Sequence, residues 1–290
     1  MTDESADLSD APVAARLARL TGARVTGCAT AGIQHGVRHY RATLADGRAV
    51  FVKQGPAGQI AAEAVGLRWL GDARAAAVPE VIAAAGDLLV LPLLPAGHAS
   101  PDAARRFGAG LAALHRAGAP AFGADWTGYI AGLPLPNEAA GDWPDWYARQ
   151  RILPYLRIAR DAGWLGPADA RLIESAAARA ADLAGPAEPP SRLHGDCWSG
   201  NVLWSGGRGW LIDPAAHGGH RETDLAMLAL FGAPYLSQIL AGYQETAPLA
   251  RGWQARVPLH QMHPLLVHVC LFGAGYREDA LAAARAVLAI

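Results

Sequence analysis

The sequence predicts an α+β fold with a β-rich N-terminal lobe over residues 1–94 and a mainly helical C-terminal lobe over residues 95–290. Apolar and polar residues alternate over 24–53, whereas the chain after Pro92 mostly shows helical spacing. Prolines and a glycine between residues 92 and 100 stiffen and bend the connector between the two patterns. With 290 residues, 52% of them hydrophobic, the chain can build a core in each lobe. A strand-rich part followed by a helical part is typical of α+β organisation with a cleft between the lobes.

The N-terminal lobe is expected to begin with an amphipathic helix and to continue with two or three antiparallel strands. The pair Asp46-Gly47 is a hairpin signal within this antiparallel part. A second helix and two further strands are expected to follow. The elements are expected, in chain order, at residues 11–20, 24–53, 61–70, 79–82 and 88–91.

Composition and charge exclude several classes of partner. The net charge is −1, so there is no electrostatic case for binding nucleic acid or an anionic membrane surface. No uninterrupted apolar run approaches the ~20 residues that a membrane-spanning helix needs. Cys28, Cys197 and Cys270 lie far apart, without metal-ligand spacing or a disulfide framework, and the N-terminus is polar and acidic rather than a signal peptide. We therefore expect a cytoplasmic protein that is a monomer or a weak dimer.

The C-terminal lobe contains an aspartate and an asparagine five positions apart, Asp196 and Asn201, and a second aspartate, Asp213, twelve positions later. Two short apolar runs on either side of a turn signal at 205–208 predict a β-hairpin between Asn201 and Asp213. Such a hairpin would hold these two side chains next to each other at one end, as chelation of a metal ion requires.

This spacing is typical of a kinase-type phosphoryl-transfer centre. Asp196 is the candidate catalytic residue, because one carboxylate must orient the attacking hydroxyl. Asn201 and Asp213 are the candidate ligands of Mg²⁺, which would bridge the phosphates of ATP. The alternative is a loop of solvated polar residues, which the spacing of the complete set disfavours. We expect the neighbouring His194 to brace the loop by hydrogen bonds, and Cys197 to be a packing residue.

A lysine at the end of a predicted strand, Lys53, is the candidate cation for the phosphates. Glu63, ten residues later on the next predicted helix, is the candidate partner that positions it. Either residue alone would be read as a surface residue, but the complete Asp-Asn-Asp set downstream favours the pair. The loop from Gly32 to Gly36 lies between two predicted strands and could cover the phosphates with backbone N–H groups. Because it has only two glycines, the alternative is an ordinary hairpin turn.

The connector after the last N-terminal strand is the candidate adenine site. Backbone groups of Pro92, Leu93 and Leu94 would face an edge of the base, and Leu203 and Ile212 would form an apolar floor beneath it. The sequence therefore predicts that ATP binds between the two lobes.

With these motifs, the chain resembles the fructosamine kinases, also called ketosamine 3-kinases, of the aminoglycoside-phosphotransferase-like branch of the protein-kinase fold. The resemblance covers nearly the whole chain. Its most specific part is the run 193–201, where Trp-Ser-Gly stands between Asp196 and Asn201. The chain departs from the family at Cys197, where leucine is usual, and in its glycine-poor loop. Other similar segments are 51–53 with Glu63, 122–128, 143–147, 212–215, 219–227 and 272–276.

The resemblance implies ATP-dependent phosphorylation of the 3-hydroxyl of a ketosamine, a ketose-derived sugar attached to an amine. The acceptor would be a small-molecule ketosamine or a glycated lysine of a protein. A 3-phosphate makes the adduct unstable, so the amine is released and a glycated protein is repaired. The preferred sugar and the preferred amine stay open.

Three residues are candidates for the substrate pocket, each with a structural alternative. Trp198 could stack on the sugar or pack in the core, and Arg221 and Glu222 could line the cleft or form a structural ion pair. Asp224 is expected to cap a helix that begins at Leu225 or to brace the catalytic loop. We expect Trp143, Trp146 and Tyr147 to be core residues. Three histidines of the C-terminal region are expected to be packing or surface residues that do not form a metal set: His260, His263 and His268.

Two other functions are compatible with parts of the sequence. Another small-molecule kinase of the same fold would act on an aminoglycoside, choline or a sugar, but the C-terminal lobe shows no dense acidic cluster for a polycationic drug. A non-catalytic nucleotide-binding protein would be expected to lack one of Lys53, Asp196, Asn201 and Asp213, and all four are present.

Overall fold

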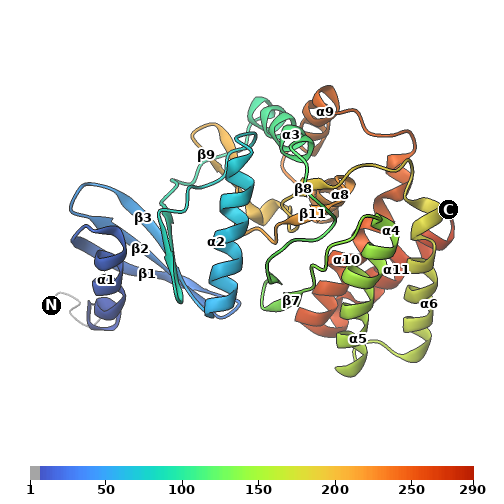
Figure 1. The fold of residues 1–290 in the computed structure, drawn as a ribbon, viewed down its shortest axis with the longest axis horizontal. Coiled ribbons are helices and arrows are strands. Elements are labelled where there is room, and N and C mark those ends of the chain that lie inside the picture. Colours follow the sequence, from blue (N-terminus) through green and yellow to red (C-terminus); the bar gives the residue numbers. More distant parts are fainter. Residues whose placement is uncertain (1–6) are drawn as a thin grey trace.

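The computed structural model describes residues 7–290, with side chains from residue 13 onward. An antiparallel sheet and its helices lie at one end of an elongated molecule, and a mainly helical part forms the other end (Figure 1). This order confirms the predicted α+β fold. The sheet has the strand order β1-β2-β3-β5-β4, with every neighbouring pair antiparallel. Its strands are β1 (Val25–Gln34), β2 (Val37–Leu44), β3 (Ala49–Gln54), β4 (Ala83–Ala85) and β5 (Leu88–Pro92).

Two helices, α1 (Asp7–Thr21) and α2 (Ala57–Asp72), cover opposite faces of this sheet (Figure 1). The residues of β5 show why both faces are covered. Leu88 and Val90 belong to the apolar cluster beneath α1, whereas Leu89 between them packs against α2. Successive side chains of a strand point to opposite faces, so a strand that is buried on both sides has a continuous apolar sequence.

The strand expected at residues 79–82 is wrong in position, because the first strand after α2 is β4 at Ala83–Ala85. Pro79 has no backbone N–H to donate to a sheet, which disfavours pairing at this point. Val78 and Val81 instead pack against the cluster between α2 and the sheet. Apolar character here reflects burial beneath a helix.

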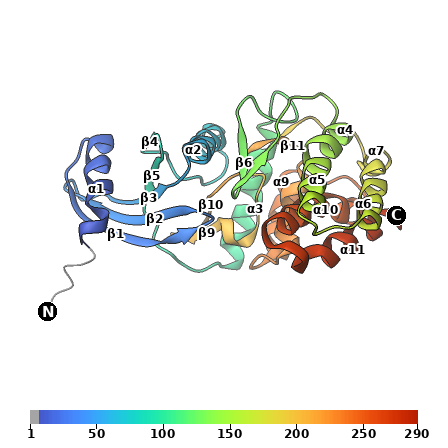
Figure 2. The ribbon, with the colours of Figure 1, turned by 90° about the horizontal axis from the view of Figure 1, so that it is seen from below.

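The rest of the chain contains three two-stranded sheets. Gly206 and Gly207 connect β9 and β10 with positive φ angles of 56° and 71°, as a two-residue hairpin turn requires. The predicted hairpin is therefore confirmed, and it lies between the N-terminal sheet and the helical part (Figure 2). The three pairs are β6 (Gly128–Ile130) with β7 (Leu133–Leu135), β8 (Ser191–Leu193) with β11 (His217–Gly219), and β9 (Val202–Ser205) with β10 (Arg208–Leu211).

Helices make up most of the part after the connector, and none within residues 7–290 is both long and apolar enough to cross a membrane. Three of the helical segments are short and not α-helical: the π-helical η1 (Ala148–Ile152) and the 3-10 helices η2 (Ser199–Asn201) and η3 (Gly273–Tyr276). The α-helices are α3 (Pro101–Arg116), α4 (Trp143–Tyr147), α5 (Leu153–Asp161), α6 (Pro167–Ala178), α7 (Ala180–Leu183), α8 (Glu222–Leu230), α9 (Leu236–Thr246), α10 (Trp253–Phe272) and α11 (Arg277–Leu288).

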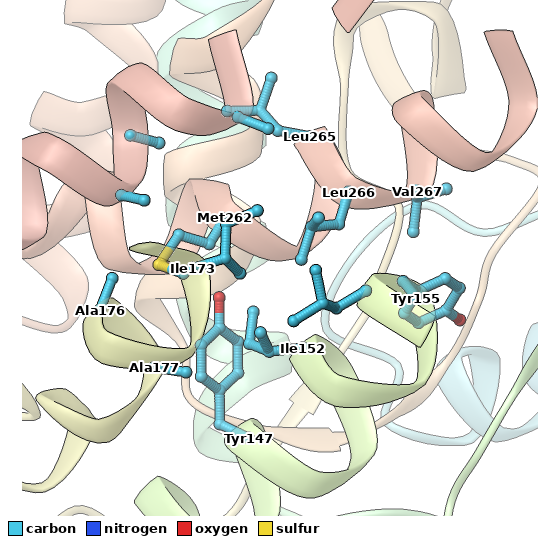
Figure 3. Close-up of a cluster of buried hydrophobic side chains, with 14 of the residues drawn as sticks. Tyr147, Ile152, Tyr155, Ile173, Ala176, Ala177, Met262, Leu265, Leu266 and Val267 are labelled. Atoms are coloured by element: carbon cyan, nitrogen blue, oxygen red, sulfur yellow. The ribbon is translucent and has the colours of Figure 1, made fainter. Parts of the chain in front are cut away.

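The largest core surrounds α10, which packs against α5 and α11 (Figure 3). Tyr147 points into this core and donates a hydrogen bond of 2.6 Å to the carbonyl oxygen of Leu259. Trp143, Trp146 and Tyr147 are at most 4% exposed, which confirms that they are core residues.

Close contact between α3 and α9 depends on two glycines. A Cβ atom on Gly108 would lie 1.9 Å from the carbonyl oxygen of Ile239, and one on Gly242 would lie 2.0 Å from that of Arg105. Each helix therefore approaches the other's backbone at a position without a side chain. This contact fixes α3, whose His115 supports the site described next.

Candidate active site

The loop after β8 is held in place by one buried carboxylate. Asp224, in the first turn of α8, accepts hydrogen bonds from the backbone N–H groups of His194 (2.8 Å) and Gly195 (3.0 Å). The Nε2 atom of His115 lies 3.0 Å from the same carboxylate. Asp224 therefore braces the loop, which was one of the two roles expected for it. It does not cap the helix, because α8 begins at Glu222 rather than at residue 225.

His194 and Cys197 have the structural roles expected from the sequence. The Nδ1 atom of His194 accepts from the backbone N–H of Asp196 (3.3 Å), and its Nε2 donates to the carbonyl oxygen of Ile212 (2.8 Å). Burial lowers the pKa of His194, which keeps the ring neutral. Cys197 is fully buried in an apolar cluster, and burial raises the pKa of its thiol well above the ordinary value.

The structure brings Asp196, Asn201 and Asp213 together at one end of the β9–β10 hairpin. The amide nitrogen of Asn201 donates to the carboxylate of Asp196 (2.8 Å) and to its backbone carbonyl oxygen (2.9 Å). Asp213 follows the hairpin with a positive φ of 54°, a left-handed conformation that aspartate tolerates better than most residues. Backbone strain of this kind concentrates at functional sites.

The carboxyl group of Asp196 titrates close to neutral pH. Desolvation in the cleft raises its pKa to about 7, with further contributions from the nearby Asp213 and Asp224, while the hydrogen bond from Asn201 acts in the opposite direction. A carboxylate with a pKa near the working pH is suited to accept a proton during a reaction.

Lys53 on β3 connects three separate segments of the chain. Its ammonium nitrogen lies 2.7 Å from a carboxylate oxygen of Glu63 on α2 and 2.6 Å from one of Asp213. The Lys53 side chain is 5% exposed. Desolvation lowers its pKa, but the two carboxylates outweigh that effect, so the net pKa of Lys53 is raised and the side chain remains a cation.

A cavity of about 480 Å³ opens between the connector and the hairpin. Its lining contains all five residues predicted to surround adenine, namely Pro92, Leu93, Leu94, Leu203 and Ile212. Lys53 and Asp213 also belong to its lining. The sequence interpretation missed Phe51, which also lines the cavity. It could have been found, because Phe51 stands two positions before Lys53 on β3 and so points to the same face of the sheet.

A smaller cavity of about 130 Å³ lies on the other side of Lys53 and includes Glu63, Asp196 and Asn201 in its lining. The turn between β1 and β2 contributes Gln34 and His35 to this cavity, and neither Gly32 nor Gly36 is part of the lining. The turn is a two-residue hairpin at His35 and Gly36, with φ angles of 47° and 80°. It therefore has the geometry of the ordinary hairpin turn that was the alternative for this loop.

Trp198 is half-buried and belongs to the lining of the smaller cavity. Its ring lies against Gly200, where a Cβ atom would come within 2.3 Å of the indole. The glycine in the Trp-Ser-Gly run thus makes room for this ring. Trp198 is the one candidate substrate residue that the structure places beside Asp196.

Arg221 and Glu222 line neither cavity, which corrects the expectation that they face the cleft. Arg221 forms a bidentate ion pair with Glu188, with N–O distances of 2.6 and 2.7 Å. Glu222 pairs with Arg256 in the same way, at 2.5 and 2.9 Å. Arg221 and Glu222 therefore each form a structural ion pair, which was the alternative expectation. Their partners lie far away along the chain.

Glu222 also lies beside two histidines that could suggest a metal site. The ligand atoms of His220, Glu222 and His260 lie within 4.8 Å of one another, and all three residues are buried. However, both carboxylate oxygens of Glu222 already accept hydrogen bonds from Arg256. The guanidinium supplies the positive charge that a metal ion would bring, so the group fits a structural network better than a metal site.

Comparisons with known proteins agree with this geometry. The fructosamine kinase family profile matches residues 11–290. The chain belongs to the fructosamine kinase family. It is accordingly an ATP-dependent phosphotransferase. A protein of Synechocystis named a probable ketoamine kinase is 35% identical over 248 residues, which cover 82% of each chain. A probable ketoamine kinase of Escherichia coli K12 is 36% identical over 218 residues, covering 73% of this chain and 74% of its own.

Solved structures show the same fold. A Thermobifida fusca protein described as a candidate fructosamine-3-kinase superposes with a TM-score of 0.93 and 53% identity, covering 96% of this chain and 99% of its own. An aminoglycoside phosphotransferase solved with AMP-PNP and hygromycin B has a TM-score of 0.66 at 16% identity, covering 96% of this chain and 97% of its own. The protein-kinase-like fold predicted from the resemblance is therefore confirmed.

Proposed function

We propose that this member of the fructosamine kinase family phosphorylates the 3-hydroxyl of ketosamines with ATP and Mg²⁺, and that the product then releases its amine. The observation that carries the proposal is the Asp196–Asn201 loop, in which Trp198 and the carboxylate of Asp196 line one cavity. The names of the relatives as ketoamine kinases support the same acceptor class.

ATP fits the two adjoining cavities. The larger one has the mainly apolar lining and the volume expected for a nucleobase site, and Lys53 is part of its lining. Held by Glu63, the ammonium of Lys53 would neutralise phosphate charge. Phe51 and Leu203 would contact the base from two sides of the cleft. The adenine would therefore lie between the connector and the hairpin.

The residues present also fit Mg²⁺. Asp213 offers a carboxylate, and Asn201 offers its amide oxygen, because its amide nitrogen is used by Asp196. Oxygen ligands of these two kinds are those that Mg²⁺ prefers. When bound, the ion would neutralise phosphate charge and orient the phosphates. Lys53 contacts the same carboxylate of Asp213 at 2.6 Å.

Asp196 would position the sugar hydroxyl and take its proton. As the hydroxyl oxygen bonds to the γ-phosphorus, the bond from that phosphorus to ADP breaks and the hydroxyl proton moves to the carboxylate. Because the pKa of Asp196 is about 7, a large fraction of the enzyme holds the carboxylate form at neutral pH. Trp198 would cover the sugar from the side of the loop.

The test is ADP release from ATP and Mg²⁺ with ribulose, erythrulose and fructose adducts of lysine, together with an aminoglycoside and choline. Asp196→Asn is the inactive control, and thermal stabilisation of this variant by ATP shows that it still folds. Turnover of a ketosamine by the wild type and not by the variant is expected. Turnover of only the aminoglycoside or choline would refute the proposed substrate class. Free glycated lysine and a glycated protein, compared at equal adduct concentration, would separate the two kinds of acceptor.

A further inference from the structure

Beyond Trp198, aromatic rings from separate segments continue away from the active site in one series. The ring of Trp198 meets Phe231 edge to face at a centroid distance of 5.9 Å, and Phe231 lies 4.8 Å from His268. His268 in turn lies 5.5 Å from Phe272 and 4.8 Å from Tyr276. We call these five residues the aromatic strip. It connects the cavity that contains Asp196 with the protein surface.

The outer end of the strip is open to solvent. Phe272 is 54% exposed. The β1–β2 hairpin faces it from the N-terminal lobe, where the ring of His35 lies 6.3 Å from that of Phe272. Ile33, two residues earlier on the same hairpin, is 67% exposed. The outer end of the strip therefore lies opposite the β1–β2 hairpin, on which Ile33 is also exposed.

The strip contains no cationic side chain that would repel a positively charged ligand. His268 donates from Nδ1 to the carbonyl oxygen of Pro264 at 2.7 Å, and burial lowers its pKa, so the ring is neutral. Aromatic faces attract cations, and most strongly where water is partly excluded. An ammonium group bound here would find aromatic faces and apolar walls.

The chemistry of a ketosamine matches this arrangement. The amine nitrogen is attached to C1 of the sugar, two carbons from C3, and a secondary amine of this kind is protonated at neutral pH. With the 3-hydroxyl at Asp196 and the sugar beside Trp198, the substituent on the nitrogen must leave the cavity along one of its open sides. The aromatic strip begins at Trp198 and leads outward from there.

We propose that the aromatic strip binds the substituent carried by the amine, and that the enzyme prefers ketosamines whose amine bears an apolar or aromatic group to those with a short substituent. This inference rests on the proposed ketosamine kinase activity and adds a specificity-determining site to it. Phe272 and Tyr276 are the residues that would contact the outer part of the substituent.

The experiment compares two adducts of the same sugar, one with ethylamine and one with 2-phenylethylamine, which differ by a single phenyl ring. The readout is the ratio of their kcat/KM values, because any loss of active enzyme cancels in a ratio. The wild type is expected to prefer the phenyl adduct by about tenfold, mainly through KM, which corresponds to one ring contact of the usual strength. Phe272→Ala and Tyr276→Ala should each reduce this ratio, and the double variant should bring it near one.

Leu153→Ala is the matched control, because Leu153 is also an exposed apolar residue of the C-terminal lobe, at 42%, and lies outside the strip. It should keep the wild-type ratio. Turnover of both adducts with equal kcat/KM, or a preference that survives the double variant, would refute the strip as the binding site while leaving the proposed function standing. If neither adduct nor any other ketosamine were phosphorylated, the proposed function itself would be refuted, and the strip with it.

Discussion

The buried ion pair between Glu222 and Arg256 makes a quantitative prediction about stability. The two side chains are 3% and 8% exposed and share two hydrogen bonds, at 2.5 and 2.9 Å. In the Glu222→Gln variant, the amide oxygen can still accept one hydrogen bond from Arg256. The amide NH₂ group, however, faces an N–H donor of Arg256, so the second bond is lost. The guanidinium of Arg256 also loses its counter-charge. A charge-assisted bond contributes about 1.5–3 kcal/mol. Adding the uncompensated buried charge gives an expected loss of about 3–5 kcal/mol in the free energy of unfolding.

Urea denaturation followed by circular dichroism at neutral pH measures this loss. The matched control is Asp145→Asn, which removes a carboxylate from the Asp145–Arg149 pair, whose side chains are 58% and 70% exposed. Exposed pairs of this kind contribute little, so the control should stay close to the wild type. Arg256→Met and the double variant complete a cycle, in which the two changes should be far from additive. A loss in Glu222→Gln no greater than that in Asp145→Asn would refute the interpretation of this pair.

Three further predictions address acid stability, catalysis and helix packing. Desolvation acts to raise the pKa of Glu222, but the interactions with His260 and then Arg256 outweigh it and hold this pKa at about 2 against an ordinary 4.5. The stabilisation from Glu222 is therefore complete above pH 4.5 and is lost as the pH falls toward 2. The stability gap between wild type and Glu222→Gln should thus narrow from pH 4.5 to 2 in acid unfolding curves, and a constant gap would contradict this. Asp196→Asn should lower kcat about 10²–10⁴-fold in ADP-release assays while ATP still raises the melting temperature, and retention of more than a tenth of kcat would exclude Asp196 as the base. Gly108→Ala should lower the free energy of unfolding by about 1–3 kcal/mol in urea titrations because its Cβ meets a backbone carbonyl at 1.9 Å, whereas Gly71→Ala, with no atom within 4 Å, should not.

Local sequence patterns predicted the parts of the site that depend on short-range geometry. The β9–β10 hairpin follows from two apolar runs and a Gly-Gly turn, and this hairpin alone brings Asn201 near Asp213. The connector residues around Leu93 were recognisable because they follow a continuous apolar strand. The strand expected at 79–82 failed for the opposite reason, since an apolar run can be buried beneath a helix without pairing in a sheet.

Charged residues were harder to place, because their partners lie far away in the sequence. Arg221 and Glu222 follow Asp213 closely along the chain, which suggested the cleft. In the fold they point to Glu188 and Arg256, 33 and 34 residues away. Nothing in the local sequence distinguishes a carboxylate that faces a ligand from one that neutralises a buried arginine.

The sequence by itself predicted the order of the β-rich and helical parts and the hairpin between Asn201 and Asp213, because strand periodicity and turn chemistry are local properties of the chain. Its motifs also carried the resemblance to the family that the family profile matches. The tertiary structure alone decided that Lys53 contacts Asp213 in addition to its expected partner Glu63, and which of its two expected roles Asp224 takes. It also decided that rings from the catalytic loop, from the end of α8, from α10 and from η3 form one strip. These features arise from packing between distant segments, whose relative positions are set by burial of the whole core rather than by any neighbouring residues.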